Sequence, residues 1–177
     1  MRFLILSFIL LSGMAVAAQS VSSPDAFLGY KLGTKYTTHQ KVVDYFRLTA
    51  ASATSRMQLK TYGTTNEGRE LLLAVVSSPE NIARLEDIRK NNLRITGILT
   101  DKPCDPSMPT IVWLSYNVHG NETSSTETAM QVLYELVSGR NADANLWLKN
   151  TVVIIDPCLN PDGRDRYVNW YTQVAGK

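Results

Sequence analysis

A histidine and a glutamate stand three residues apart in the segment Asn-Val-His-Gly-Asn-Glu, residues 117–122. An imidazole nitrogen from His119 and a carboxylate oxygen from Glu122 are two of the three protein ligands that a catalytic zinc ion takes, with water in the remaining position. Gly120 lies between them and allows the backbone to turn tightly without a Cβ clash. These residue types predict a metal site in which His119 and Glu122 bind Zn2+.

The same pair also has an interpretation without a metal. His119 would then be a hydrogen-bonded loop histidine, and Glu122 would be an acid favoured by the dipole at a helix N-terminus. The spacing alone is too common to separate the two interpretations. The position of the pair between predicted elements is what favours the metal site.

A second polar segment, Asn-Pro-Asp-Gly at residues 160–163, follows a later apolar run. Proline fixes φ and glycine accepts a positive φ, so the segment predicts a turn. Arg164 and Arg166 follow it and are candidates for binding an anionic substrate group, although a solvated position is the commoner one for arginine. The only other histidine, His39, is predicted to be a surface residue at the start of a helix.

The elements that must position these segments are two apolar runs at residues 110–116 and 151–156. The first contains Ile-Val-Trp-Leu at 111–114, a run that suits a strand buried on both faces. Between the runs, residues 123–138 show helical apolar spacing, and Gly139 suits a helix end. Strand, helix and strand in this order predict a right-handed crossover with parallel strands. Their carboxyl ends then share one sheet edge, where open α/β sheets bind ligands.

The preceding part of the chain predicts further elements of the same domain. A helix capped by Thr38 carries apolar residues at helical spacing. Residues 57–62 and 71–77 read as strands joined by a hairpin-type loop, and residues 79–91 as a helix that begins at a proline.

Composition limits the classes of protein. A chain of 177 residues with 44% hydrophobic and 19% charged residues suits one globular domain. The net charge of +2 and the absence of any block of five like charges give nucleic acid no support as a partner. The oligomeric state is left open.

The first eighteen residues predict a signal peptide. Arg2 precedes an apolar stretch that ends in alanines, and this stretch falls short of the roughly 20 residues of a membrane span. We therefore expect an exported protein, periplasmic or secreted, with no membrane span in the mature chain. Residues 1–18 form the signal peptide in this division, residues 19–37 a leader segment and residues 38–177 the domain.

Three segments in this order resemble the zinc carboxypeptidase family, the carboxypeptidase A-like metallopeptidases. They are Tyr-Gly-Thr-Thr-Asn-Glu-Gly-Arg-Glu-Leu at residues 62–71, the His-x-x-Glu segment at 117–122 and Asn-Pro-Asp-Gly at 160–163. The resemblance runs from about Lys41 to the C-terminus. It implies that His119 and Glu122 are zinc ligands. It also implies an α/β fold with a mixed, largely parallel sheet of about eight strands flanked by helices, phosphorylase/hydrolase-like, of which this chain supplies about half.

The resemblance implies an exported zinc metallocarboxypeptidase that hydrolyses C-terminal residues from peptides or proteins with a zinc-activated water. The family also uses a second histidine ligand, an Asn-Arg pair for the substrate carboxylate and a glutamate as general base. This chain has none of these at matching positions, so we expect them downstream of Lys177. The domain is then the N-terminal part of a longer catalytic domain, and we expect no peptidase activity from it alone.

Two other functions remain open at this stage. Zinc amidohydrolases of the succinylglutamate desuccinylase and aspartoacylase type share a His-Gly-x-Glu loop, and an inactive exported binding domain would keep the fold without the catalysis. The export signal and the Glu-Gly-Arg hairpin favour the peptidase.

Overall fold

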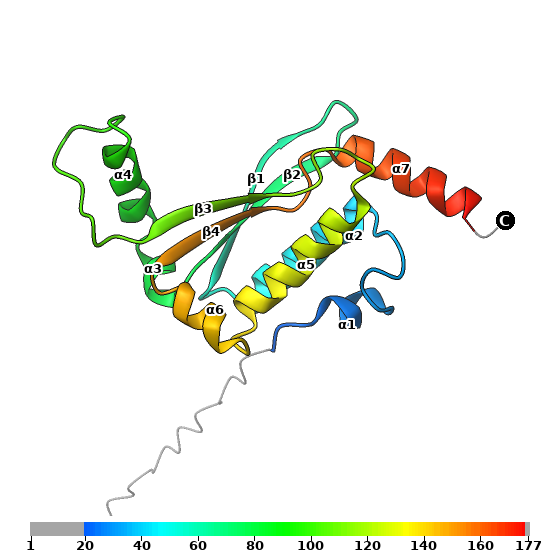
Figure 1. The fold of residues 1–177 in the computed structure, drawn as a ribbon, viewed down its shortest axis with the longest axis horizontal. Helices are drawn as coiled ribbons and strands as arrows, with labels where there is room; N and C mark the ends of the chain where they lie inside the picture. The colour runs from blue at the N-terminus through cyan, green and yellow to red at the C-terminus, as the bar shows by residue number, and fades with distance from the viewer. Residues whose placement is uncertain (1–19, 176–177) are drawn as a thin grey trace, which may run out of the picture.

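The fold is built around a mixed four-stranded sheet (Figure 1). The computed structural model describes residues 20–175. In that part of the chain the strands are β1 (Met57–Thr64), β2 (Glu70–Val76), β3 (Thr110–Ser115) and β4 (Thr151–Asp156), in the spatial order β1-β2-β4-β3. The β1–β2 and β2–β4 pairs are antiparallel, and β3 runs parallel to β4. The predicted α/β class with a mixed sheet, the hairpin and the parallel pair are confirmed.

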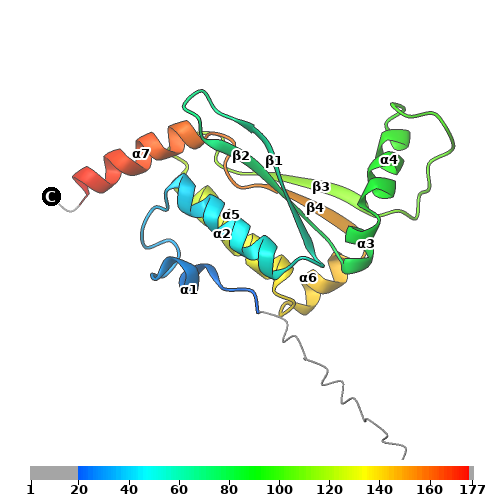
Figure 2. The ribbon, with the colours of Figure 1, turned by 180° about the vertical axis from the view of Figure 1, so that it is seen from behind.

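Two helices cover one face of the sheet. Figures 1 and 2 show α2 (His39–Ser52) and α5 (Thr123–Val137) side by side on that face. Because side chains alternate along a strand, Leu72, Ala74 and Val76 of β2 all turn to this side and are buried. The helices contribute their apolar stripes to the same core: Val42, Val43, Tyr45, Phe46, Ala129, Met130, Leu133 and Val137.

The predicted leader contributes a short helix, α1 (Pro24–Leu28), that packs against α2. The ring centroids of Phe27 and Tyr45 lie 5.3 Å apart, and Leu28 is buried in the core. Part of the leader is therefore an integral layer of the domain. The predicted signal peptide, residues 1–18, lies outside the described residues.

The helix predicted over residues 79–91 is divided in two, α3 (Pro79–Ala83) and α4 (Leu85–Ile95). Arg84 separates them with a φ of −122°, outside the helical range. The buried side chain of Asn81 donates hydrogen bonds of 3.0 Å to two backbone carbonyls just before β4. These bonds tie α3 to the end of the sheet, and α4 continues in a new direction (Figure 1).

Strand β3 lies at the edge of the described sheet, and none of its side chains is fully buried, which corrects the prediction that both its faces are buried. Val112 is 39% exposed and Trp113 is 57% exposed. The apolar composition is that of a central strand, but β3 pairs only with β4 within residues 20–175. Strand β4 lies between two neighbours and is buried along most of its length.

Helix α6 (Ala142–Trp147) lies in the connection between α5 and β4. After β4 the chain continues into α7 (Pro161–Val174). Helix α7 begins at the carboxyl end of β4 and extends away from the sheet (Figure 2). None of the helices within residues 20–175 has the length and apolar character to cross a membrane.

Candidate metal centre

The two polar segments meet at the carboxyl ends of β3 and β4, as predicted. The N–H of Leu159 donates to the carbonyl of Tyr116 at 3.0 Å, and the N–H of Asn160 donates to the carbonyl of Asn117 at 3.2 Å. The Asn160 side chain also donates to the carbonyl of Val118 at 3.1 Å. The two loops are thus one hydrogen-bonded unit, and the position of one fixes the other.

Two glycines lie where the loops touch. A Cβ on Gly120 would stand 2.1 Å from the carbonyl carbon of Gly163, which is far inside van der Waals contact. Gly163 has no positive φ and lies in the first turn of α7, which corrects the predicted turn. The segment begins a helix because Pro161 suits the first helical position and Asn160 caps it, accepting from the Gly163 N–H at 3.0 Å. Gly120 is needed for close backbone contact.

His119 and Glu122 contact one another just before α5. The Nδ1 atom of His119 lies 2.9 Å from Oε1 of Glu122, and the His119 backbone N–H donates to Oε2 at 3.2 Å. These hydrogen bonds hold the pKa of Glu122 below its ordinary value. The exposed fractions of the two side chains are 72% and 50%. An imidazole and an ionised carboxylate therefore meet in a position open to solvent.

The pair fits a zinc ion in the kind of donor, since imidazole nitrogen and carboxylate oxygen are both zinc ligands. A catalytic site needs three such ligands, and residues 20–175 contain no group of three His, Cys, Asp or Glu side chains arranged to hold a metal. Glu122 also occupies the N-cap position of α5, where the helix dipole favours an acid. The assignment of His119 and Glu122 as metal ligands stays a prediction, supported by their contact.

Arg164 is fully buried, which corrects the expectation that it is solvated. Its Nη2 atom lies 2.8 and 2.7 Å from the two carboxylate oxygens of Glu127. Its other nitrogens donate to the carbonyls of Thr123, at 2.6 Å, and Thr37, at 3.2 Å. Each nitrogen of the guanidinium has an internal partner, so Arg164 stabilises the first turns of α5 and cannot reach a substrate from this position.

Arg166 is exposed, as expected, and pairs with Glu67 in the hairpin loop. Glu67 also pairs with Arg69, whose guanidinium lies 2.8 Å from Asp162 and 2.8 Å from Asp165. This charged network joins the β1–β2 loop to the first turns of α7. The opposite charges in the hairpin loop and in residues 162–166 were the signal in the sequence for this contact.

A buried carboxylate behind the loops was also missed. Asp156 is 1% exposed at the end of β4. It accepts a 2.6 Å hydrogen bond from the hydroxyl of Tyr62 and a 3.2 Å bond from the N–H of Cys158. Burial raises the pKa of Asp156 and the pKa of Tyr62. An acid that directly ends a buried apolar strand was the signal in the sequence.

His39 is 3% exposed, which corrects its prediction as a surface residue. Its Nε2 lies 2.7 Å from the carbonyl of Glu70, and its backbone N–H donates to Asp165 at 2.8 Å. Burial is the main cause of a lowered pKa for His39, and Arg69 adds to it, whereas Glu70 and Asp165 oppose it. His39 therefore joins α2 to the hairpin and to α7.

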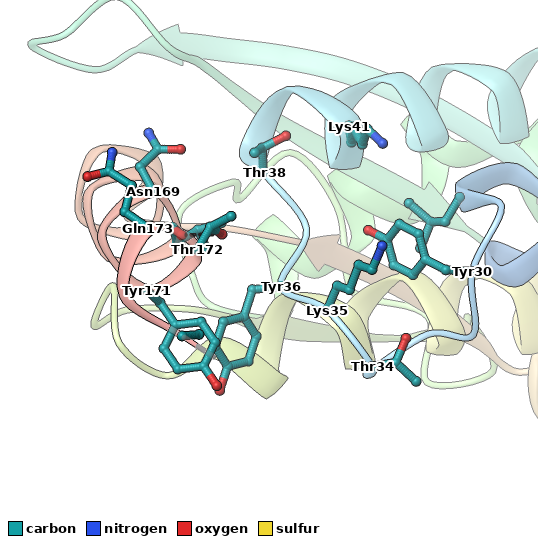
Figure 3. A pocket seen from close by; sticks show the side chains of 13 residues that line it. Tyr30, Thr34, Lys35, Tyr36, Thr38, Lys41, Asn169, Tyr171, Thr172 and Gln173 are labelled. Atoms are coloured by element: carbon teal, nitrogen blue, oxygen red, sulfur yellow. Dashed lines mark hydrogen bonds between the residues drawn. The ribbon is translucent and has the colours of Figure 1, made fainter. Parts of the chain in front are cut away.

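Two hollows border α7. The larger has a volume of about 910 Å3 and lies between the C-terminal half of α7 and residues 28–41 (Figure 3). In it, the ammonium group of Lys35 lies 5.3 Å from the ring centroid of Tyr30, and that of Lys41 lies 5.8 Å from it. None of its lining residues belongs to the two loops. The smaller, of about 380 Å3, adjoins the candidate ligands. It is lined by Gly120, Asn121, Gly163, Arg166, Tyr167 and Trp170.

The fold is shared with solved structures of carboxypeptidases and related proteins. Carboxypeptidase A from Helicoverpa armigera is 20% identical with a TM-score of 0.53, over 73% of this chain and 26% of that chain. Thrombin-activatable fibrinolysis inhibitor is 15% identical with a TM-score of 0.53, over 75% of this chain and 27% of that chain. The bovine form of that inhibitor, in complex with tick carboxypeptidase inhibitor, is 16% identical with a TM-score of 0.51, over 80% and 35%.

The chain therefore spans only 26% to 35% of the length of these structures, and identities this low establish the fold alone. A family model is more specific. The model described as zinc carboxypeptidase matches residues 42–174, which include both loops and the hairpin. The sequence, the fold and this match agree, and the chain belongs to the zinc carboxypeptidase family.

Proposed function

We propose that this chain is part of an exported zinc metallocarboxypeptidase that removes C-terminal residues from peptides or proteins. The observation that carries the proposal is the contact between His119 and Glu122 at the carboxyl ends of β3 and β4, in a chain of this family. Among structures of the same fold, one is named a carboxypeptidase A and another is bound to a carboxypeptidase inhibitor.

In the proposed mechanism, His119 and Glu122 would hold a zinc ion through an imidazole nitrogen and a carboxylate oxygen. When bound, zinc supplies polarisation of the scissile carbonyl and activation of a water at neutral pH. Glu122 would supply an anionic oxygen, and its hydrogen bonds to His119 lower its pKa. We place the general base, a carboxylate, downstream of Lys177.

The hollow beside the loops gives the substrate a place next to the candidate ligands. Gly120 and Asn121 line it from the loop of the candidate ligands, and Tyr167 and Trp170 line it from α7. The two rings lie 5.6 Å apart, and Trp170 is 56% exposed. We propose that the peptide chain lies along this aromatic surface.

We also propose that residues 38–177 are the N-terminal part of a longer catalytic domain. The short coverage of the solved structures supports this, and so does β3, whose edge position leaves Val112 and Trp113 exposed without the charges or prolines that protect natural edges. Residues 19–177 alone should bind zinc weakly and show no peptidase turnover. Robust turnover by this purified segment would overturn the proposal.

Export is tested by the N-terminus of the mature protein. If residues 1–18 are a signal peptide, protein recovered from the periplasm or medium starts at residue 18 or 19. Recovery of protein that retains these residues would contradict export by cleavage. Mass spectrometry of the intact chain distinguishes the two results.

The metal assignment is tested by zinc content and zinc affinity in the longest expressible form of the protein. We expect stoichiometric zinc in the wild type and its loss in His119→Ala and Glu122→Ala. Asn121→Ala is the matched control, because Asn121 is exposed between the two ligands and is not assigned to the metal. Absence of zinc from a wild-type form that includes the downstream region would overturn the proposal.

The substrate class is tested on the zinc-loaded form. Peptides with free C-termini should be hydrolysed, and the same peptides with amidated C-termini should not. Hydrolysis of acylated amino acids in place of peptides would identify an amidohydrolase. Zinc binding without turnover of either class would identify an inactive binding domain.

A further inference from the structure

Asn117 has an unusual backbone conformation at the end of β3. Its φ of 55° makes it the one non-glycine residue with a positive φ among residues 20–175. Asparagine tolerates this left-handed region better than most residues, but glycine adopts it with less strain. Asn117 is also only 1% exposed. A buried polar side chain at a strained position calls for a reason that lies in its contacts.

The side chain of Asn117 bonds to both candidate ligand residues. Its Nδ2 donates to the carbonyl of His119 at 3.0 Å and to the carbonyl of Glu122 at 3.1 Å. One amide group therefore spans the loop and fixes the backbone at both ends of the His-x-x-Glu segment. The N–H of Asn117 donates to Oγ of Ser125 at 2.7 Å, which ties the same residue to α5.

The orientation of this amide is determined by its partners. Carbonyl oxygens only accept hydrogen bonds, so the NH2 group must face His119 and Glu122. The amide oxygen then faces Cys158, whose Sγ lies 3.2 Å away and donates. Cys158 is 2% exposed, and burial raises its pKa to about 12, so it stays a protonated thiol able to donate. Both N–H donors and the oxygen of Asn117 have partners.

We propose that Asn117 is a positioning residue of the candidate metal centre: its amide holds the backbone of His119 and Glu122 so that both side chains can share one ion, and Cys158 orients that amide. The inference rests on the proposed role of the two ligands. Mutation of a group that orients metal ligands typically lowers metal affinity by about 10–100-fold. Asn117 does not contact the metal in this scheme, since its action passes through the backbone carbonyls.

The test is zinc affinity measured by competition with a chelator, on the longest expressible form that includes the downstream region. Asn117→Gly is the informative variant because glycine keeps the positive φ and removes only the amide. We expect its affinity for zinc to fall at least about 10-fold. The visible spectrum of the cobalt-substituted protein should change as well, because the two ligands are no longer held in one arrangement.

Asn81→Ala is the matched control. Asn81 is a buried asparagine with a similar set of hydrogen bonds, but it lies in α3, at the opposite end of the sheet. Urea unfolding of both variants measures the loss of stability. If Asn117→Gly lowers zinc affinity and Asn81→Ala, with a comparable loss of stability, does not, Asn117 is a positioning residue.

Cys158 supplies a second arm. Cys158→Ser keeps a donor to the amide oxygen and should retain most of the zinc affinity, whereas Cys158→Ala should lose part of it. The inference is overturned if Asn117→Gly binds zinc within twofold of the wild type, or if both asparagine variants lose affinity alike. Absence of zinc from the wild type is a different result, because it overturns the proposed function itself.

Discussion

From the buried ion pair between Arg164 and Glu127 we predict a large loss of stability when Arg164 is replaced, which the sequence alone would not have suggested. Arg164→Met removes the guanidinium from a site with no exposed surface. Glu127 then keeps one donor, the N–H of Thr37 at 2.6 Å, for a carboxylate that is 6% exposed. The carbonyl of Thr123 loses the 2.6 Å bond that Arg164 donates.

Breaking a buried ion pair by removing one partner costs about 3–5 kcal/mol, because the remaining charge is left buried. Whole domains are stable by only about 5–15 kcal/mol, so Arg164→Met should remove a large share of the free energy of unfolding. Urea unfolding followed by circular dichroism measures this loss. The double variant Arg164→Met/Glu127→Gln removes both charges and should be more stable than Arg164→Met.

The result that would refute this prediction follows from the other position that the Arg164 side chain could take, at the protein surface. An exposed arginine in a surface ion pair contributes about 0–1 kcal/mol. A loss below 1 kcal/mol would show that Arg164 is not buried with Glu127. A double variant no more stable than Arg164→Met would show that the remaining charge is not the source of the cost.

Three further predictions test other contacts. The pKa of buried His39 lies below its ordinary value, so the unfolded chain takes up the proton first and stability falls as pH drops below about 6.5. His39→Gln should lose this component, at most about 1.4 kcal/mol per pH unit, in urea titrations between pH 7 and pH 5. Tyr62→Phe should cost about 1–3 kcal/mol at pH 7 by leaving Asp156 short of a donor, and the cost should shrink as the pH falls and Asp156, whose pKa is raised by burial, takes up a proton. Trp113→Lys should reduce self-association of residues 19–177 in sedimentation experiments, because it places a charge on the exposed edge strand.

The elements that could be predicted well from the sequence are those in which buried residues recur at the regular spacing of a strand or a helix. Residues of β2 alternate between faces, and those of α5 follow a helical stripe, so both patterns report burial directly. The meeting of the two loops also followed from topology, because a right-handed crossover brings the ends of β3 and β4 together. These are local or topological consequences of the apolar residues.

The errors concern residues whose surroundings come from distant parts of the chain. Arg164 is buried because Glu127 and Thr37 converge on it from two other segments, and no local pattern reports that convergence. The sequence predicted that Gly163 allows a turn. In the structure its backbone instead lies against Gly120 of the other loop. The apolar run in β3 indicated a strand buried on both faces, but whether its faces are covered depends on elements from other parts of the chain.

The Asn117 amide and the Arg164–Glu127 ion pair, neither of which was predicted from the sequence, bind to the same short stretch of backbone. Asn117 bonds to the carbonyl of Glu122, and Arg164 bonds to the carbonyl of Thr123, the next residue along. The start of α5 is therefore held by a neutral amide on one side and by a buried ion pair on the other. The side chains of His119 and Glu122 remain exposed, so they keep the freedom to accept a ligand. Because the backbone is already ordered, the metal binding that we propose would cost little further backbone entropy, which is the general advantage of a preorganised site.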